Sequence, residues 1–228
     1  MIGVTENLSI IRDLLHQAAV DAGRMPESVT LVAVSKKHPV TAVLEAAAAG
    51  QRDFGENFVQ EGVDKIQQAG RDDLVWHFIG HLQSNKTRDA AKYFDWVHTI
   101  DRIKVARRLA EQRPDDLPPL NVCVQVNVDE GVSKSGVAPA AAIDLALEVA
   151  ALDRLRFRGF MCIPDPADDV GEQRRVFRKL RKLGEAARKC GLTVDTLSMG
   201  MSADYVSAIA EGATLVRIGT AVFGPRPG

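Results

Sequence analysis

The stretch Leu31-Val32-Ala33-Val34-Ser35-Lys36-Lys37-His38-Pro39 decides how the rest of the chain is interpreted. Its first part, Leu31–Ser35, is apolar or small throughout, which is typical of a strand buried on both faces of a parallel sheet. The strand ends at a lysine pair, and folds built from parallel strands place their chemistry in the loops that follow the strands. A lysine amine among apolar walls loses its charge and attacks carbonyl groups, so one interpretation of this stretch is a Schiff-base lysine.

The alternative interpretation is that Lys36 and Lys37 are two solvated loop cations, and this stretch taken alone favours that alternative. Successive side chains of a strand point to opposite sides, so the two lysines face different ways. Periodicity does not choose between them, and the choice depends on the rest of the chain.

Composition predicts one domain over residues 1–228, because a chain of 228 residues with 46% hydrophobic residues can bury a substantial core. The net charge of −1 gives no overall attraction to nucleic acid or to an anionic membrane. Cys123, Cys162 and Cys190 form no CxxC pair, which indicates a reducing cytoplasm. The histidines form no HExxH motif, so we expect no metal site. No apolar run is long enough to span a membrane, and the amphipathic N-terminus does not resemble a signal peptide.

Eight segments predicted as strands alternate with segments predicted as helices along the chain. The predicted strands are Leu31–Ser35, Arg52–Gly55, Val75–Ile79, Phe94–Thr99, Asn121–Val128, Phe157–Ile163, Val194–Leu197 and Thr214–Ile218. The predicted helices are an N-terminal one capped by Thr5 and closed by Gly23, one ending at Gln68, one starting near Lys86, and Val40–Ala49, Arg102–Gln112, Pro139–Leu152, Val170–Cys190 and Ser202–Glu211.

This alternation, without a linker or a break in composition, predicts an α/β fold: a single (β/α)8 TIM barrel. A doubly wound sheet is the alternative, but eight short βα units in 228 residues fit a compact barrel better. We expect no room for a helix after the eighth strand. The N-terminal helix is therefore expected to cover the barrel wall there.

Two glycine-containing loops follow the last two predicted strands. The first loop, 198–204, contains Gly200 and Ser202, and the second contains Gly219 and Thr220. Barrels that bind phosphorylated ligands often hold the phosphate between these two loops, on backbone N–H groups and a helix start. The pattern predicts a phosphate site with hydroxyls from Ser202 and Thr220. The alternative is a pair of ordinary turns with Ser202 as a helix cap.

Three further polar positions lie on the same predicted rim. Arg217 stands in an apolar strand, where a buried guanidinium needs a partner: a ligand in the barrel mouth, a buried carboxylate, or solvent at the strand end. Glu56-Asn57 and His81 follow the second and third strands. Taken singly, such residues are more often caps or loop contacts than ligands.

A basic run over residues 174–182 raises the question of RNA binding. Two apolar residues within the run, Val176 and Leu180, and Leu183 directly after it recur at helical spacing. The charges are therefore interpreted as the solvated face of a barrel helix, and not as a nucleic-acid site.

Six motifs, taken together and in order, resemble the pyridoxal phosphate homeostasis proteins. They are Ala33-Val34-Ser35-Lys36, Phe54-Gly55-Glu56-Asn57, His77-Phe78-Ile79-Gly80-His81-Leu82-Gln83-Ser84-Asn85-Lys86, Gly159-Phe160-Met161, Leu197-Ser198-Met199-Gly200-Met201-Ser202 and Val216-Arg217-Ile218-Gly219-Thr220. The resemblance covers nearly the whole chain. It implies a barrel like the N-terminal domain of alanine racemase, of the fold type III kind, that binds pyridoxal 5′-phosphate (PLP) as an internal aldimine.

The resemblance also implies a role for each matched residue. Lys36, directly after Ala-Val-Ser, would carry the aldimine, which decides against Lys37. The remaining cofactor contacts would be the phosphate ligands Ser202, Gly219 and Thr220, the lining residues Asn57, His81 and Met199, and Arg217 at the pyridine nitrogen. One loop, Asp129–Gly136, departs from the family pattern, because Gly131 stands where a glutamate is usual. No role of a carboxylate in this loop is therefore carried over from the family, whereas the cofactor site is unaffected.

The function implied by the resemblance is to carry or buffer PLP in intracellular PLP homeostasis, without a dedicated reaction and without catalytic residues. We expect a cytoplasmic monomer whose partners are PLP and PLP-dependent apoenzymes, and neither nucleic acid nor membrane. The alternatives are a PLP-dependent amino-acid racemase and a Schiff-base aldolase that uses no PLP. An arginine at the pyridine nitrogen weakens the cofactor as an electron sink. Alanine racemase also takes a second acid–base group, a tyrosine, from its partner's C-terminal domain, and we expect no such domain here.

Overall fold

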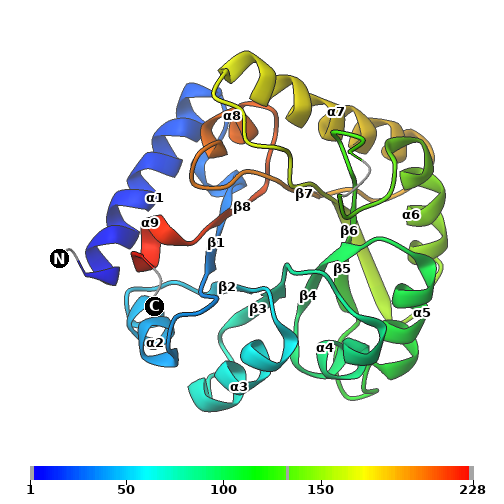
Figure 1. Cartoon of the computed structure of the whole chain (residues 1–228), viewed down its shortest axis with the longest axis horizontal. Coiled ribbons are helices and arrows are strands. Elements are labelled where there is room, and N and C mark those ends of the chain that lie inside the picture. The colour runs from blue at the N-terminus through cyan, green and yellow to red at the C-terminus, as the bar shows by residue number, and fades with distance from the viewer. Residues whose placement is uncertain (1–2, 132–133, 226–228) are drawn as a thin grey trace.

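Eight parallel strands close into a barrel in which β1 pairs with β8, and helices surround it (Figure 1). This computed structural model describes residues 3–131 and 134–225. The strands are β1 (Thr30–Val34), β2 (Asp53–Glu56), β3 (Val75–Phe78), β4 (Trp96–Ile100), β5 (Leu120–Gln125), β6 (Leu155–Met161), β7 (Thr196–Ser198) and β8 (Leu215–Ile218). The α-helices are α1 (Val4–Asp21), α2 (Val40–Ala48), α3 (Val59–Ala69), α4 (Thr87–Tyr93), α5 (Ile103–Gln112), α6 (Ala142–Ala150), α7 (Val170–Lys189), α8 (Tyr205–Ala210) and α9 (Thr220–Phe223).

The predicted (β/α)8 barrel is therefore confirmed, and so is the position of its first strand. In β1, Leu31, Val32, Ala33 and Val34 are all buried, because one face packs in the barrel interior and the other against the helices. The register of β1 with β8 places Val32 beside Arg217 and Ala33 beside Ile218. Closure thus brings the end of β1 next to the end of β8.

The N-terminal helix covers the part of the wall formed by the last and first βα units, as predicted. Helix α1 lies between α8 and α2 and beside α9 (Figure 1). Its buried side chains Leu8, Ile11, Leu15 and Ala18 recur every three or four residues, which places one stripe of the helix on the barrel. Asn7 also donates a hydrogen bond to the carbonyl of Val222 in α9.

Two predicted helix starts were wrong, and one short helix was not predicted. Helix α1 starts at Val4 with Gly3 as its N-cap, so Thr5 does not cap it. Helix α8 starts at Tyr205, because the Asp204 carboxylate accepts a hydrogen bond from the backbone N–H of Met201 and forms a turn before the helix. After β8 there is room for one helical turn, α9, where none was expected. The predicted loop over Asp129–Gly136 includes residues 132 and 133, which lie outside the described residues.

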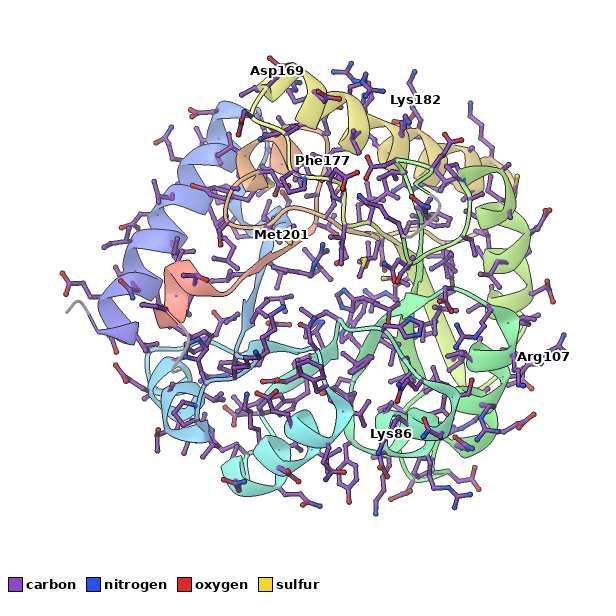
Figure 2. The ribbon with its side chains drawn as sticks, in the orientation of Figure 1. Lys86, Arg107, Asp169, Phe177, Lys182 and Met201 are labelled. Atoms are coloured by element: carbon purple, nitrogen blue, oxygen red, sulfur yellow. The ribbon has the colours of Figure 1, made fainter. Side chains whose placement is uncertain are left out.

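The basic run lies on α7, with Val176 and Leu180 buried and Leu183 partly buried against the barrel, as predicted. Figure 2 shows Lys182 of α7 directed away from the barrel and Phe177 on its inner side, where Phe177 is fully buried. Over residues 3–131 and 134–225, no helix combines the length and apolar character needed to cross a membrane. The same residues contain no cluster of three or more histidine, cysteine or acidic side chains suited to a metal ion.

Candidate functional site

A cavity lies at the carboxyl ends of the strands, where the chain leaves β1, β2, β3, β6, β7 and β8. It is lined by Val34, Lys36, His38, Asn57, Ile79, Ile163, Met201, Ser202, Arg217, Gly219 and Thr220. Six of the eight predicted site residues therefore meet in one place: Lys36, Asn57, Ser202, Arg217, Gly219 and Thr220. Strands that run parallel around a closed barrel bring their carboxyl ends to one rim, which explains why residues distant in sequence converge.

The structure separates the two lysines that follow β1. Lys36 is half-buried and lines the cavity, whereas Lys37 is exposed outside it. Lys37 has a left-handed backbone (φ 64°), and its N–H donates to the Glu61 carboxylate. This turn directs the chain away from the cavity directly after Lys36.

A buried polar cluster lies beneath the turn that follows β1, next to Lys36 in the chain. The Lys65 Nζ of α3 donates to the carbonyl of Ser35 at 2.7 Å, to Glu56 Oε1 at 2.7 Å and to Glu61 Oε1 at 2.8 Å. The Ser35 hydroxyl also donates to Glu56 Oε1, at 2.6 Å. Burial raises the pKa of the Glu56 carboxyl, and the Lys65 charge opposes that rise. The cluster therefore ties β1, β2 and α3 together next to Lys36.

At the other side of the cavity, the loops after β7 and β8 present Ser202, Gly219 and Thr220. A Cβ atom at Gly219 would lie 3.1 Å from the carbonyl oxygen of Val34, so this position favours glycine for the close approach of β8 to β1. Within the described part of the chain, the hydroxyls of Ser202 and Thr220 make no hydrogen bond. Both are available to donate to a ligand.

Asn57 is fixed at the rim by the next βα loop. A Cβ atom on Gly80 would lie 2.0 Å from the carbonyl oxygen of Asn57, so only glycine allows these two loops to touch. The side-chain oxygen of Asn57 is buried and has no hydrogen-bond partner among the described residues. Such an orphaned acceptor in the wall of a cavity is consistent with a ligand that supplies the missing donor.

Arg217 lies at the floor of the cavity and is 4% exposed. Its Nη1 donates to the Ser198 hydroxyl at 2.7 Å and its Nη2 to the carbonyl of Cys162 at 2.9 Å. No carboxylate pairs directly with it in the part of the chain that the structure describes. Burial lowers the pKa of the guanidinium, which stays charged because its reference value is so high.

Two predicted residues lie outside this cavity. His81 is exposed and lines a neighbouring cavity that shares Asn57, Ile79 and Ile163 with the first. Met199 is fully buried in the wall, and Met201 lines the cavity. Figure 2 shows Met201 on the loop that follows β7, over the barrel mouth.

Sequence reasoning missed five lining residues: Val34, His38, Ile79, Ile163 and Met201. Ile163 and His38 follow β6 and β1 by two and four residues, and position after a strand was the only signal that pointed to them.

The charges around the cavity favour an anion. Among the described lining residues, the ionisable side chains are Lys36, His38 and Arg217, and no aspartate or glutamate is present. An amine, an arginine and unpaired hydroxyls and amide oxygen together fit a ligand with a carbonyl and a phosphate, which PLP has.

The sequence of this chain is similar to a known protein family and to proteins of several bacteria. The alanine racemase N-terminal domain family matches residues 11–227, so the fold and the cavity define a protein of the alanine racemase N-terminal barrel class. The pyridoxal phosphate homeostasis protein of Escherichia coli strain K12 is 52% identical over 226 residues, covering 98% of this chain and 97% of that protein. The protein of the same name from Pseudomonas aeruginosa is 52% identical over 223 residues, covering 98% of this chain and 96% of that protein. The chain belongs to the family of pyridoxal phosphate homeostasis proteins.

Two solved structures share the fold of this chain. PipY of Synechococcus elongatus, solved with PLP bound, superposes with a TM-score of 0.84 at 36% identity, covering 97% of this chain and all (100%) of that one. Alanine racemase from Corynebacterium glutamicum superposes with a TM-score of 0.74 at 20% identity. That match covers 99% of this chain and 61% of that one, and it shows the shared fold alone.

Proposed function

We propose that this protein binds PLP in the cavity at the barrel mouth, with the PLP aldehyde joined to the Lys36 amine. The observation that carries the proposal is that Lys36 shares one acid-free cavity with Arg217 and with the unpaired hydroxyls of Ser202 and Thr220. The hydroxyls hold the phosphate together with the backbone at Gly219, and Arg217 faces the pyridine ring. Bound PLP supplies an electrophilic carbon and an electron-withdrawing ring. The PLP-bound PipY structure supports the same ligand.

The protein then serves as a carrier or buffer of PLP and takes part in PLP homeostasis in the cytoplasm, as a monomer that exchanges PLP with dependent apoenzymes. The names of its relatives support this role. The composition of the cavity supports it too: no tyrosine or carboxylate side chain among the described residues lines the cavity beside Lys36. Such groups would move protons on a bound amino acid.

The test of covalent binding is to titrate the purified protein with PLP, to reduce it with borohydride and to map the labelled peptide. We expect the pyridoxyl group on Lys36, and loss of labelling in Lys36→Ala. The matched control is Lys37→Ala, which removes the neighbouring exposed lysine and should label like the wild type. A label on Lys37, or no absorbance change on adding PLP, contradicts the proposal.

The carrier role is tested in cells. Deleting the gene should disturb the PLP pool and the reactions that depend on it, and the wild-type gene should restore both. Complementation by Lys36→Ala to the same level would separate the cellular role from the covalent site and overturn this part of the proposal.

A further inference from the structure

A chain of hydrogen-bonded side chains crosses the barrel interior below the cavity. It links Arg217 of β8, Ser198 of β7, His98 of β4, His77 of β3 and Asp53 of β2. The successive distances are 2.7 Å from Arg217 Nη1 to Ser198 Oγ and 2.8 Å from Ser198 Oγ to His98 Nδ1. The next two are 2.9 Å from His98 Nε2 to His77 Nδ1 and 3.0 Å from His77 Nε2 to Asp53 Oδ1. These five residues are called the relay below.

The relay joins the floor of the cavity to the opposite end of the barrel. Ser198, His98 and His77 are fully buried, and Arg217 is nearly so. Asp53 is the first residue of β2, and its side chain is 26% exposed. It lines a surface hollow between α1, the connection from α1 to β1, and the residues that lead into β2. One end of the relay thus faces the ligand cavity and the other end faces solvent.

The chemistry of the two ends gives the relay one direction. Arg217 can only donate, so the Ser198 oxygen accepts from it. A carboxylate oxygen of Asp53 accepts from His77, so His77 carries a proton on Nε2. With neutral rings, His77 Nδ1 then accepts from His98 Nε2–H, and His98 Nδ1 accepts from the Ser198 hydroxyl. Every hydrogen bond of the relay is satisfied in this arrangement, with both histidines in the Nε2–H form.

The opposite direction requires His77 to be doubly protonated. His98 would then donate to Ser198, whose hydroxyl hydrogen would have no acceptor in the relay. A second positive charge would also enter an interior that already contains the Arg217 guanidinium. Burial is the largest cause that lowers the pKa of His98 well below its usual value, in agreement with a neutral ring.

We propose that Asp53, His77, His98 and Ser198 are positioning residues for Arg217. The Asp53 carboxylate sets the direction of the relay, and the relay fixes which N–H groups of the guanidinium are left to face the ligand. Of the five N–H donors of Arg217, one goes to Ser198 and one to the Cys162 carbonyl, so the remaining donors are directed by these two anchors. Apolar side chains usually fill such barrel interiors, and a fully paired polar chain there serves orientation. The identity of the ligand rests on the proposed function; the direction of the relay does not.

The first test uses the protein without ligand. Long-range ¹H–¹⁵N correlation spectra of the imidazole rings report which nitrogen carries the proton. In the wild type at neutral pH, we expect His77 and His98 both neutral and protonated on Nε2. Asp53→Asn should populate a second tautomer, because an amide both donates and accepts. Asp73→Asn is the matched control, since it removes a carboxylate that pairs with Arg71 and Arg52 outside the relay. A wild-type proton on His98 Nδ1, or identical spectra for the two variants, overturns the proposal.

The second test measures the effect on the cavity. We expect Asp53→Asn to weaken PLP binding about five-fold, the equivalent of one neutral hydrogen bond, and to shift the absorbance maximum of bound PLP. Asp73→Asn should change neither quantity. Ser198→Ala breaks the relay next to Arg217 and gives a second variant should Asp53→Asn fold poorly. Adding Asp53→Asn to Ser198→Ala should then have no further effect, because the connection is already broken.

The outcomes are distinguishable from those of the proposed function. If the wild type binds no PLP, the proposed function fails while the imidazole spectra still decide the direction of the relay. If PLP binds and the effects of Asp53→Asn and Ser198→Ala add as independent changes, the relay does not act as a unit and the inference is wrong.

Discussion

Side chains around the cavity fall into two groups: those that the protein already pairs and those that it leaves for a ligand. Arg217 is anchored by Ser198 and the Cys162 carbonyl, so its position is set before a ligand arrives. By contrast, the Ser202 and Thr220 hydroxyls and the Asn57 amide oxygen have no partner among the described residues. A pre-positioned cation with unpaired hydrogen-bonding groups around it lowers the entropy cost of ordering the site on binding.

The phosphate contacts are predicted to be separable from the covalent bond. Thr220→Ala or Ser202→Ala removes a hydroxyl donor to a charged acceptor, a loss of about 1.5–3 kcal/mol, or roughly a 10- to 150-fold rise in the PLP dissociation constant. The covalent product at Lys36 should still form at higher PLP concentration. Thr193→Ala, at an exposed position outside the cavity, is the control. Variants that titrate like the wild type would place the phosphate elsewhere.

At the scale of elements, the contact among β1, β2 and α3 depends on one lysine. Lys65 is 6% exposed and Glu56 fully buried, and Lys65 supplies the positive charge in their cluster. Removing one partner of a buried pair leaves the other charge uncompensated, which costs more than the pair itself contributes.

Lys65→Met is therefore expected to lower the free energy of unfolding by about 3–5 kcal/mol, measured by urea denaturation of the protein without ligand. The control is Lys92→Met, which removes an exposed lysine from α4. Combining Lys65→Met with Glu56→Gln should recover part of the loss, because the amide does not carry the buried charge. A loss no larger than that of Lys92→Met would show that Glu56 is already neutral in the fold.

Helices α7 and α8 meet through Glu211, which is 2% exposed and ion-paired with Arg174, Arg178 and Arg181. Burial on its own would raise the pKa of the Glu211 carboxyl. The hydrogen bonds from Arg178 and Arg174 outweigh burial and hold that pKa below its usual value of 4.5. A carboxyl with a lowered pKa in the folded state adds stability above its unfolded-state pKa, and that stability is lost as the pH falls through the folded-state value.

Glu211→Gln should therefore be less stable than the wild type at neutral pH, and the difference should shrink as the pH falls below about 4.5. Urea unfolding at a series of pH values measures this difference. Glu185→Gln, at an exposed residue 4.0 Å from Arg181, is the control and should follow the wild type. Parallel curves for Glu211→Gln and the wild type at all pH values would show that the arginines do not shift this carboxyl.

For the whole molecule, the barrel was predictable because most strands are short apolar runs and most helices have a buried stripe. These are local patterns, and eight repeats of them leave few possible folds. Helix starts were less predictable, since a single side chain can decide them. The Asp204 carboxylate accepts a hydrogen bond from the backbone N–H of Met201, and α8 begins after this turn, at Tyr205, and not at Ser202. The rim positions of Ser202, Thr220 and the lysine pair were predictable because strand ends define the rim, but the choice of Lys36 over Lys37 came from the family resemblance.

The relay was not predictable from sequence, because its bonds join residues far apart along the chain. His98 and Ser198 are 100 positions apart, and His77 and His98 are 21 apart. No local pattern marks a histidine on a strand as part of a hydrogen-bonded chain. Similarly, Met199 and Met201 flank Gly200, whose left-handed backbone (φ 96°) reorients the loop, and the sequence does not tell which methionine lines the cavity.

The last prediction concerns activity. Racemisation needs acid–base groups on both faces of the substrate's α-carbon. Lys36 supplies one, and His38, the other titratable lining residue besides Arg217, comes from the same turn and stacks on Phe223. Arg217 is unsuited to the role because it does not give up its proton. Over the described residues, no tyrosine lines the cavity from the opposite side.

We therefore expect the PLP-loaded protein to racemise alanine and serine no faster than an equal concentration of free PLP. Chiral chromatography of each amino acid after incubation measures this, with Lys36→Ala as the control for the covalent site. The rate of racemisation by free PLP is measured with PLP alone at the same concentration and is compared with the rate of the loaded protein. Multiple turnovers that disappear in Lys36→Ala would defeat the carrier role and identify a racemase, because only a cofactor held at Lys36 and flanked by working acid–base groups would produce them.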